Sequence, residues 1–128
     1  MSLSVERFLS FSEEAQLQTI KDLNDIGQEE LIIETLTGVG IENLPVPLLG
    51  ELGRAYNNND KPEEAIKVLN SIDEEYRDAV WYYRCAYSYG AIVSNNHEVY
   101  TSNNMQHMLA LVDNGIRLAV SENRNNIT

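Results

Sequence analysis

Hydrophobic residues recur every three to four positions along most of the chain, and no long alternating run of β-branched residues interrupts them. This spacing is typical of helices that bury one face, whereas strands alternate with a period of two residues. The sequence therefore predicts an all-α protein in which well over half of the residues are helical.

The N-terminal part predicts a first hairpin over residues 4–40, built from two short helices at residues 13–25 and 28–37. Ser10 and Glu13 have the spacing of a capping box in front of the first helix. Gly27 separates the two helices, because glycine readily takes the conformations that end a helix.

The middle of the chain predicts a second hairpin over residues 46–78. Pro45 and Pro47 suit the first turn of a helix, where a missing amide donor costs nothing. Asp60 and Glu63 have capping-box spacing at the start of the next helix. The connection of about four residues between these helices is short enough to force an antiparallel pair.

The C-terminal part predicts a third hairpin over residues 79–121, followed by a frayed tail at 122–128. An aromatic-rich helix over 79–93 precedes a polar stretch at 94–103 that reads as a loop. On the final helix, near 104–121, the predicted core stripe consists of Met105, Met108, Leu109, Val112, Ile116 and Ala119.

Length and charge narrow the classes of function. The 128 residues, 43% of them hydrophobic, are enough for one domain with a real core. The net charge of −11 repels phosphate backbones and anionic headgroups, so we expect no nucleic-acid or membrane partner. The acidic residues concentrate in the N-terminal half, which either steers a basic partner or forms a solvated helix face.

The chain contains one cysteine, Cys85, which cannot form an internal disulfide. No basic and then apolar leader opens the sequence, and its longest aliphatic run is far shorter than a bilayer span. These features favour a cytoplasmic protein.

Residues 46–91 resemble the tetratricopeptide repeat (TPR) family, and similar runs occur in small bacterial proteins of this family. Tyr56 and Tyr89 are 33 residues apart, close to the period of stacked helical hairpins. Leu52, Gly53 and Tyr56, followed by Ala65, Leu69 and Ile72, follow the family's pattern of small and large residues. The resemblance implies a short right-handed superhelix of hairpins closed by a capping C-terminal helix, with an insertion at 94–103.

The resemblance also implies that the first helix of each hairpin lines a concave groove for a peptide. The matching positions are Arg54, Asn57 and Asn58 in one unit and Tyr83, Arg84 and Tyr87 in the next. Tyrosine offers rigid contact area, asparagine hydrogen-bonds peptide backbone, and arginine binds carboxylates. The alternative is that the tyrosines pack between helices and that both arginines pair with Glu51 or Asp78.

The leading hypothesis is therefore a non-catalytic adaptor that binds a protein or peptide. The alternatives are a sensor of a signalling peptide or small ligand, and a homo-oligomerising accessory subunit without a groove ligand. No phosphate loop, nucleophile elbow or dinucleotide fingerprint suggests an enzyme, and we expect no cofactor. His97, Glu98, His107 and Asp113 lack the tight spacing of metal ligands, and Cys85 occupies a packing position.

Leu111 and Leu118 lie outside the predicted core stripe of the final helix. They are one heptad apart and about 120° from the centre of that stripe, where a capping helix should be polar. They either lie beneath the 94–103 segment, form ordinary exposed positions, or bury against a second copy of the chain in a homodimer.

Overall fold

The computed structural model describes residues 3–95 and 102–127, and all regular elements in these ranges are helical. The α-helices are α1 (Val5–Leu9), α2 (Glu13–Asp25), α3 (Glu29–Val39), α4 (Val46–Asn58), α5 (Pro62–Asn70), α6 (Ala79–Asn95) and α7 (Ser102–Ile127). Two short 3₁₀ turns, η1 (Ile41–Asn43) and η2 (Glu74–Tyr76), precede α4 and α6. The all-α prediction is confirmed.

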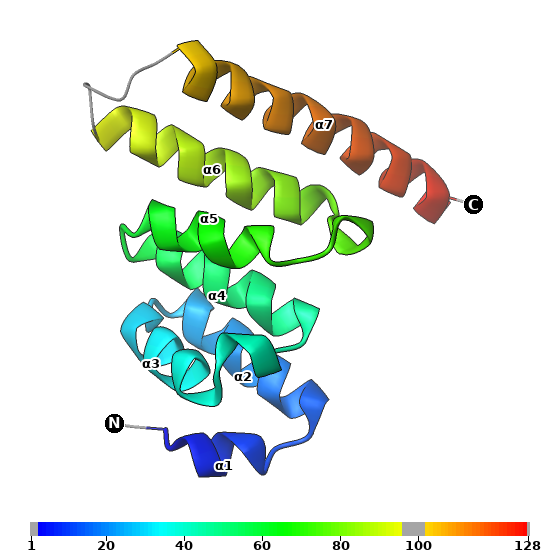
Figure 1. Ribbon diagram of the computed structural model, residues 1–128. Coiled ribbons are helices and arrows are strands. Elements are labelled where there is room, and N and C mark those ends of the chain that lie inside the picture. Colours follow the sequence, from blue (N-terminus) through cyan, green and yellow to red (C-terminus); the bar gives the residue numbers. More distant parts are fainter. Residues whose placement is uncertain (1–2, 96–101, 128) are drawn as a thin grey trace.

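The helices follow one another from the N-terminal to the C-terminal end of the molecule (Figure 1). α4 packs against both α2 and α3, and α6 packs in the same way against both α4 and α5. α1 covers α3 at one end, and α7 runs antiparallel to α6 at the other. One cluster of buried apolar side chains runs through the stack from Phe8 to Leu111.

The turn between α2 and α3 depends on a glycine, as the sequence predicted. Gly27 has a φ of 75°, in the left-handed region that side chains with a Cβ disfavour. This conformation lets the Gln28 N–H donate to the Leu23 carbonyl at 2.9 Å, a bond that closes many helix ends. The chain therefore reverses within a few residues and starts α3.

Both predicted capping boxes are wrong. Ser12 caps α2 by accepting a hydrogen bond from the Ala15 N–H at 3.1 Å, whereas Ser10 lies at the end of α1, a helix that the sequence analysis missed. Asp60 has a φ of 58° and lies in the turn before α5, whose N-cap is Lys61. Capping-box spacing alone could not separate a helix start from a neighbouring turn.

The predicted small and large positions of the middle hairpin do pack together. Ala65, Leu69 and Ile72 are buried, and Leu69 lies directly against Gly53 of α4. A Cβ added to Gly53 would approach the Leu69 side chain to 2.6 Å. The absence of a side chain at Gly53 therefore sets the distance between α4 and α5.

The connection between α5 and α6 is fixed by side chains that bond to the end of α5. The Trp81 indole N–H donates to the Leu69 carbonyl at 2.7 Å, and Arg77 donates to the Asn70 carbonyl at 3.2 Å. The Arg77 guanidinium also lies 4.3 Å from the centre of the Trp81 ring. A cation at a helix C-terminus hydrogen-bonds the last carbonyls and interacts favourably with the helix dipole. Because Arg77 also contacts Trp81, it orients α6 relative to α5.

The predicted inner face of α7 is wrong for four of its six residues. Met105 and Met108 are half-buried, and Met108 packs against the core, but Ala119 is exposed. Leu111 is buried in the core and Leu118 is half-buried, whereas Leu109, Val112 and Ile116 of the predicted core stripe are exposed. The face toward α6 includes Gly115, where an added Cβ would lie 3.0 Å from the Tyr82 Cβ. Glycine does not count as apolar in a periodicity pattern. The face of α7 that contains Gly115 and packs on α6 therefore gave a weaker hydrophobic pattern than the exposed face.

The boundaries around α7 also differ from the prediction. Residues 122–127 continue the helix instead of forming a frayed tail, because no glycine or proline follows residue 121 and Glu122 accepts a hydrogen bond from the Ala79 N–H at 3.4 Å. Residues 96–101 of the predicted loop at 94–103 lie outside the described residues. Of the helices that the structure describes, even α7 with its 26 residues is not apolar enough to cross a membrane.

We expect Gly53→Ala to destabilise the protein, because Leu69 is fully buried and cannot move away from a new methyl group. Overpacking of this kind costs about 1–3 kcal/mol of unfolding free energy. Gly90→Ala is the matched control, since a Cβ there meets only the flexible Met108 side chain at 3.3 Å. Urea unfolding followed by circular dichroism measures both changes, and equal stability of the two variants would contradict the close α4–α5 packing.

Candidate functional site

The six residues predicted to line a groove border one pocket between α4 and α6. Its volume is about 310 Å³, and it is lined by Arg54, Asn57 and Asn58 of α4 and by Val80, Tyr83, Arg84 and Tyr87 of α6. The sequence analysis missed Val80. Its position three residues before Tyr83, on the same helix face, is the signal that could have found it.

The surface continues from this pocket toward α2. A second pocket of about 310 Å³ shares Val80 and Arg84 with the first and reaches Leu17 and Lys21 of α2. Three helices that are separated in sequence, α2, α4 and α6, therefore form one continuous face of the molecule. We call this surface the α2–α4–α6 face.

Tyr83 and Tyr87 project into solvent from α6. Tyr83 is 69% exposed and Tyr87 is 49% exposed, so neither side chain is buried between helices. They are four residues apart and thus neighbours on the helix surface. Each presents a large apolar ring with a polar tip, the combination that is enriched in protein interfaces.

Glu51 joins the two arginines at the base of this face. Its buried carboxylate contacts Arg84 at 2.8 Å and Arg54 at 3.3 Å, and Arg54 also contacts Asp25 of α2 at 3.0 Å. Two guanidinium groups are thus balanced by two carboxylates. Pairing of both arginines with Glu51 was one of the alternatives left open by the sequence; Asp78 instead accepts a hydrogen bond from the Trp81 N–H at the start of α6.

Asn24 brings α2 into the same network, and the sequence analysis missed it. Its side-chain amide donates to the Glu51 backbone carbonyl at 3.1 Å and to the Glu51 carboxylate at 3.2 Å. Asn24 follows Ile20 by four positions, so it is a polar residue on an otherwise apolar stripe. That position was the available signal, because a buried amide needs a partner.

Asn57 connects α4 to α6 through two side-chain hydrogen bonds. Its amide donates to the Arg84 carbonyl at 3.0 Å, and its oxygen accepts a hydrogen bond from the Ser88 hydroxyl at 2.6 Å. Asn57 and Ser88 are both buried. Asn57 therefore holds the two walls of the pocket together, whereas Asn58, the neighbouring amide, is exposed.

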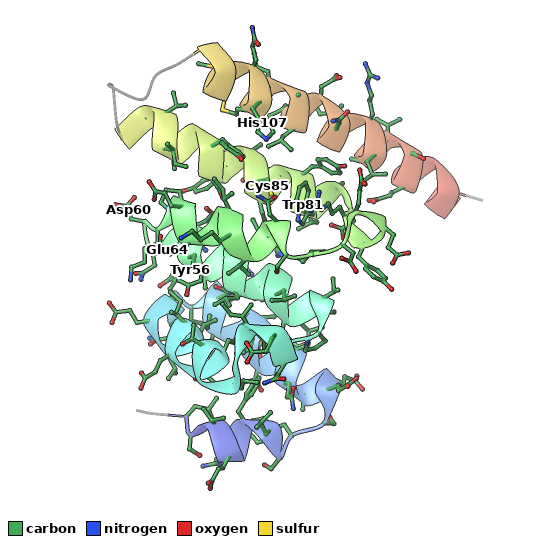
Figure 2. The ribbon with its side chains drawn as sticks, viewed as in Figure 1. Tyr56, Asp60, Glu64, Trp81, Cys85 and His107 are labelled. Atoms are coloured by element: carbon green, nitrogen blue, oxygen red, sulfur yellow. The ribbon has the colours of Figure 1, made fainter. Side chains whose placement is uncertain are left out.

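Cys85 is buried on the side of α6 that faces α5 (Figure 2). Burial raises the pKa of its thiol to about 12, against a smaller opposing effect of the Arg77 charge. A thiol with this pKa stays protonated at neutral pH and is a poor nucleophile. Burial likewise raises the pKa of Tyr56, and the nearby Glu64 carboxylate adds to that shift (Figure 2).

The residues considered as metal ligands are separated in the structure. The His107 ring packs edge-to-face on Tyr89 with 4.6 Å between ring centres, and Asp113 pairs with Arg117 at 3.1 Å. His97 and Glu98 lie outside the described residues. Within the described part of the chain, no three His, Cys, Asp or Glu side chains gather in an arrangement that could hold a metal ion.

Comparison with known proteins gives no relative from which a site could be transferred: no family model, no curated protein and no solved structure matches this chain. The function of the α2–α4–α6 face must therefore be argued from its own geometry.

We expect Glu51→Ala to lower the unfolding free energy by about 3 kcal/mol, because it leaves Arg84, whose side chain is only 17% exposed, without a counter-ion. Asp25→Asn is the control, since it removes a 65%-exposed partner of Arg54 and should cost less than about 1 kcal/mol. Denaturant unfolding of both variants tests the difference. Similar losses in the two would mean that Glu51 does not organise the face.

Proposed function

We propose that this protein is a TPR-like, non-catalytic adaptor that binds a peptide segment of another protein on the α2–α4–α6 face. The contact pattern supports the TPR-like arrangement, because each first helix of a hairpin packs against both helices of the preceding hairpin. The 33-residue spacing of Tyr56 and Tyr89 and the close fit of Gly53 against Leu69 support it as well.

The observation that carries the proposal is the pocket between α4 and α6. Tyr83 and Tyr87 are exposed on its wall, while the polar side chains at its base are held in place by one another. A surface fixed in this way loses little conformational entropy when a ligand binds. Exposed tyrosines on such a rigid base are typical of residues that contribute strongly to protein interfaces.

The pocket also indicates the chemistry of the ligand. Val80, Tyr83 and Tyr87 favour an apolar or aromatic side chain, and the exposed Asn58 amide suits a peptide backbone. Both arginines already have carboxylate partners, so the site does not require an anionic ligand. Its volume of about 310 Å³ lies at the low end of the ~300–1,000 Å³ typical of small-molecule sites, which favours single side chains of a peptide.

A random peptide-display library panned on the wild-type protein tests the proposal. We expect selection of peptides with an aromatic or large apolar anchor. In fluorescence-polarisation titrations, Tyr83→Ala/Tyr87→Ala should weaken their binding at least about 30-fold, or roughly 2 kcal/mol, because truncated interface tyrosines have effects of this size.

Leu9→Ala is the matched control, since Leu9 is 53% exposed on α1, at the opposite end of the stack from α6. It should leave affinity unchanged, and circular dichroism should show that the double tyrosine variant keeps its helix content. A library that yields no binder, or peptides that bind the double variant as tightly as the wild type, would contradict a peptide site between α4 and α6.

A further inference from the structure

A second groove, of about 350 Å³, lies between α6 and α7 at the C-terminal end of the stack. Small and apolar residues line it: Ala79, Val80, Tyr83, Ala86, Leu111, Val112, Gly115, Ile116 and Ala119. α4 packs against the pair α2/α3, and α6 packs against the pair α4/α5. No further described helix packs against the pair α6/α7, because α7 is the last described helix of the stack (Figure 1). The groove therefore continues the stacking surface of the fold.

An apolar ridge on α7 borders this groove. Leu109, Val112, Ile116 and Val120 are between 41% and 60% exposed. At 100° per residue they lie within about 80° of one another, so they form one line along the helix. α7 thus has two apolar faces, one packed on α6 and the other, the α7 ridge, open to solvent.

Exposed apolar side chains of α6 and α7 adjoin one another at this groove. Val80 and Tyr83 of α6, which line the groove, are 49% and 69% exposed and extend the apolar surface of the α7 ridge. A stable interface buries about 800 Å² on each partner, most of it around an apolar centre. The α7 ridge supplies such an apolar centre, and the exposed Asp113 and Arg117 side chains supply part of a polar rim.

Charge indicates which partner fits. Residues 79–128 carry three basic and three acidic residues, so the whole net charge of −11 lies in residues 1–78. Two copies of this chain repel each other through their N-terminal parts and can approach without repulsion at α6 and α7. The apolar patch lies on this neutral end.

We propose that α6 and α7 form the interface of a homodimer, in which the α7 ridge of each copy enters the α6/α7 groove of the other. A two-fold axis across α7 between Val112 and Ile116 sets Val112 against Ile116 of the second copy. The two α7 helices are then antiparallel, and the four helices form one bundle at the centre of an elongated dimer.

The rim of the ridge is complementary to itself in this arrangement. Asp113 and Arg117 pair at 3.1 Å on α7, and their side chains are 60% and 76% exposed. Antiparallel α7 helices bring Asp113 to within about one helical turn of Arg117 of the second copy, and the reverse contact follows by symmetry. Opposite charges therefore meet on the open side of the interface.

Sedimentation equilibrium on the full chain, from about 1 to 500 μM, tests the dimer. We expect the wild type to dimerise and Ile116→Glu to raise the dissociation constant at least about 100-fold, because it places a charge in an apolar interface. Asn114→Glu adds the same charge to an exposed position on the same turn, outside the ridge, and should leave the dimer intact. Ile116→Ser is a second variant, with helix content checked by circular dichroism.

Charge reversal tests the two-fold arrangement. Arg117→Glu makes the rim wholly acidic and should weaken the dimer about tenfold, whereas Asp113→Arg/Arg117→Glu restores opposite charges and should recover it. A wild type that is monomeric at 500 μM overturns the proposal, as does a dimer that Ile116→Glu leaves intact. Recovery that fails in the double variant overturns the antiparallel geometry. Neither Ile116 nor Asp113 borders the α4/α6 pocket, but Val80 and Tyr83 line both sites, so the dimer is measured in the absence of peptide.

Discussion

The buried carboxylate of Glu51 is the constraint around which the middle of this fold is arranged. A carboxylate removed from water is unfavourable unless cations and hydrogen-bond donors surround it. Here those groups come from three helices: the Asn24 amide from α2, Arg54 from α4 itself, and Arg84 from α6. A shift of one helix along another would leave at least one of these polar groups buried without its partner, so the network fixes the relative positions of α2, α4 and α6.

The same network explains why the α2–α4–α6 face can serve as a binding surface. Asn57 and Ser88 tie α4 to α6 just beside Arg84, and the aromatic side chains of Tyr83 and Tyr87 project from the helix that is held there. The polar side chains at the base of this face form hydrogen bonds and ion pairs with one another, which reduces their flexibility. The face therefore combines a fixed base with exposed rings, and its arginines contribute orientation more than net charge.

Periodicity predicted most of the helices because each buries one apolar face, and the bounds of α2 are the expected 13–25. The six groove residues were predicted by the resemblance to the TPR family, and they border one pocket. The contact between Asn24 and Glu51, which are 27 residues apart, was not predictable, because nothing in the sequence links them. The inner face of α7 was misassigned because Gly115, which allows the close approach to Tyr82, adds nothing to an apolar pattern.

A double-mutant cycle between Glu51 and Arg84 tests the central role of this network most directly. Glu51→Gln and Arg84→Met each remove one charge while keeping much of the side-chain volume, and the cycle compares the unfolding free energies of both single variants with that of the pair. A shared buried contact at 2.8 Å predicts a coupling energy on the order of 2 kcal/mol. Additive effects, within about 0.5 kcal/mol, would contradict the view that Glu51 holds α4 and α6 in register.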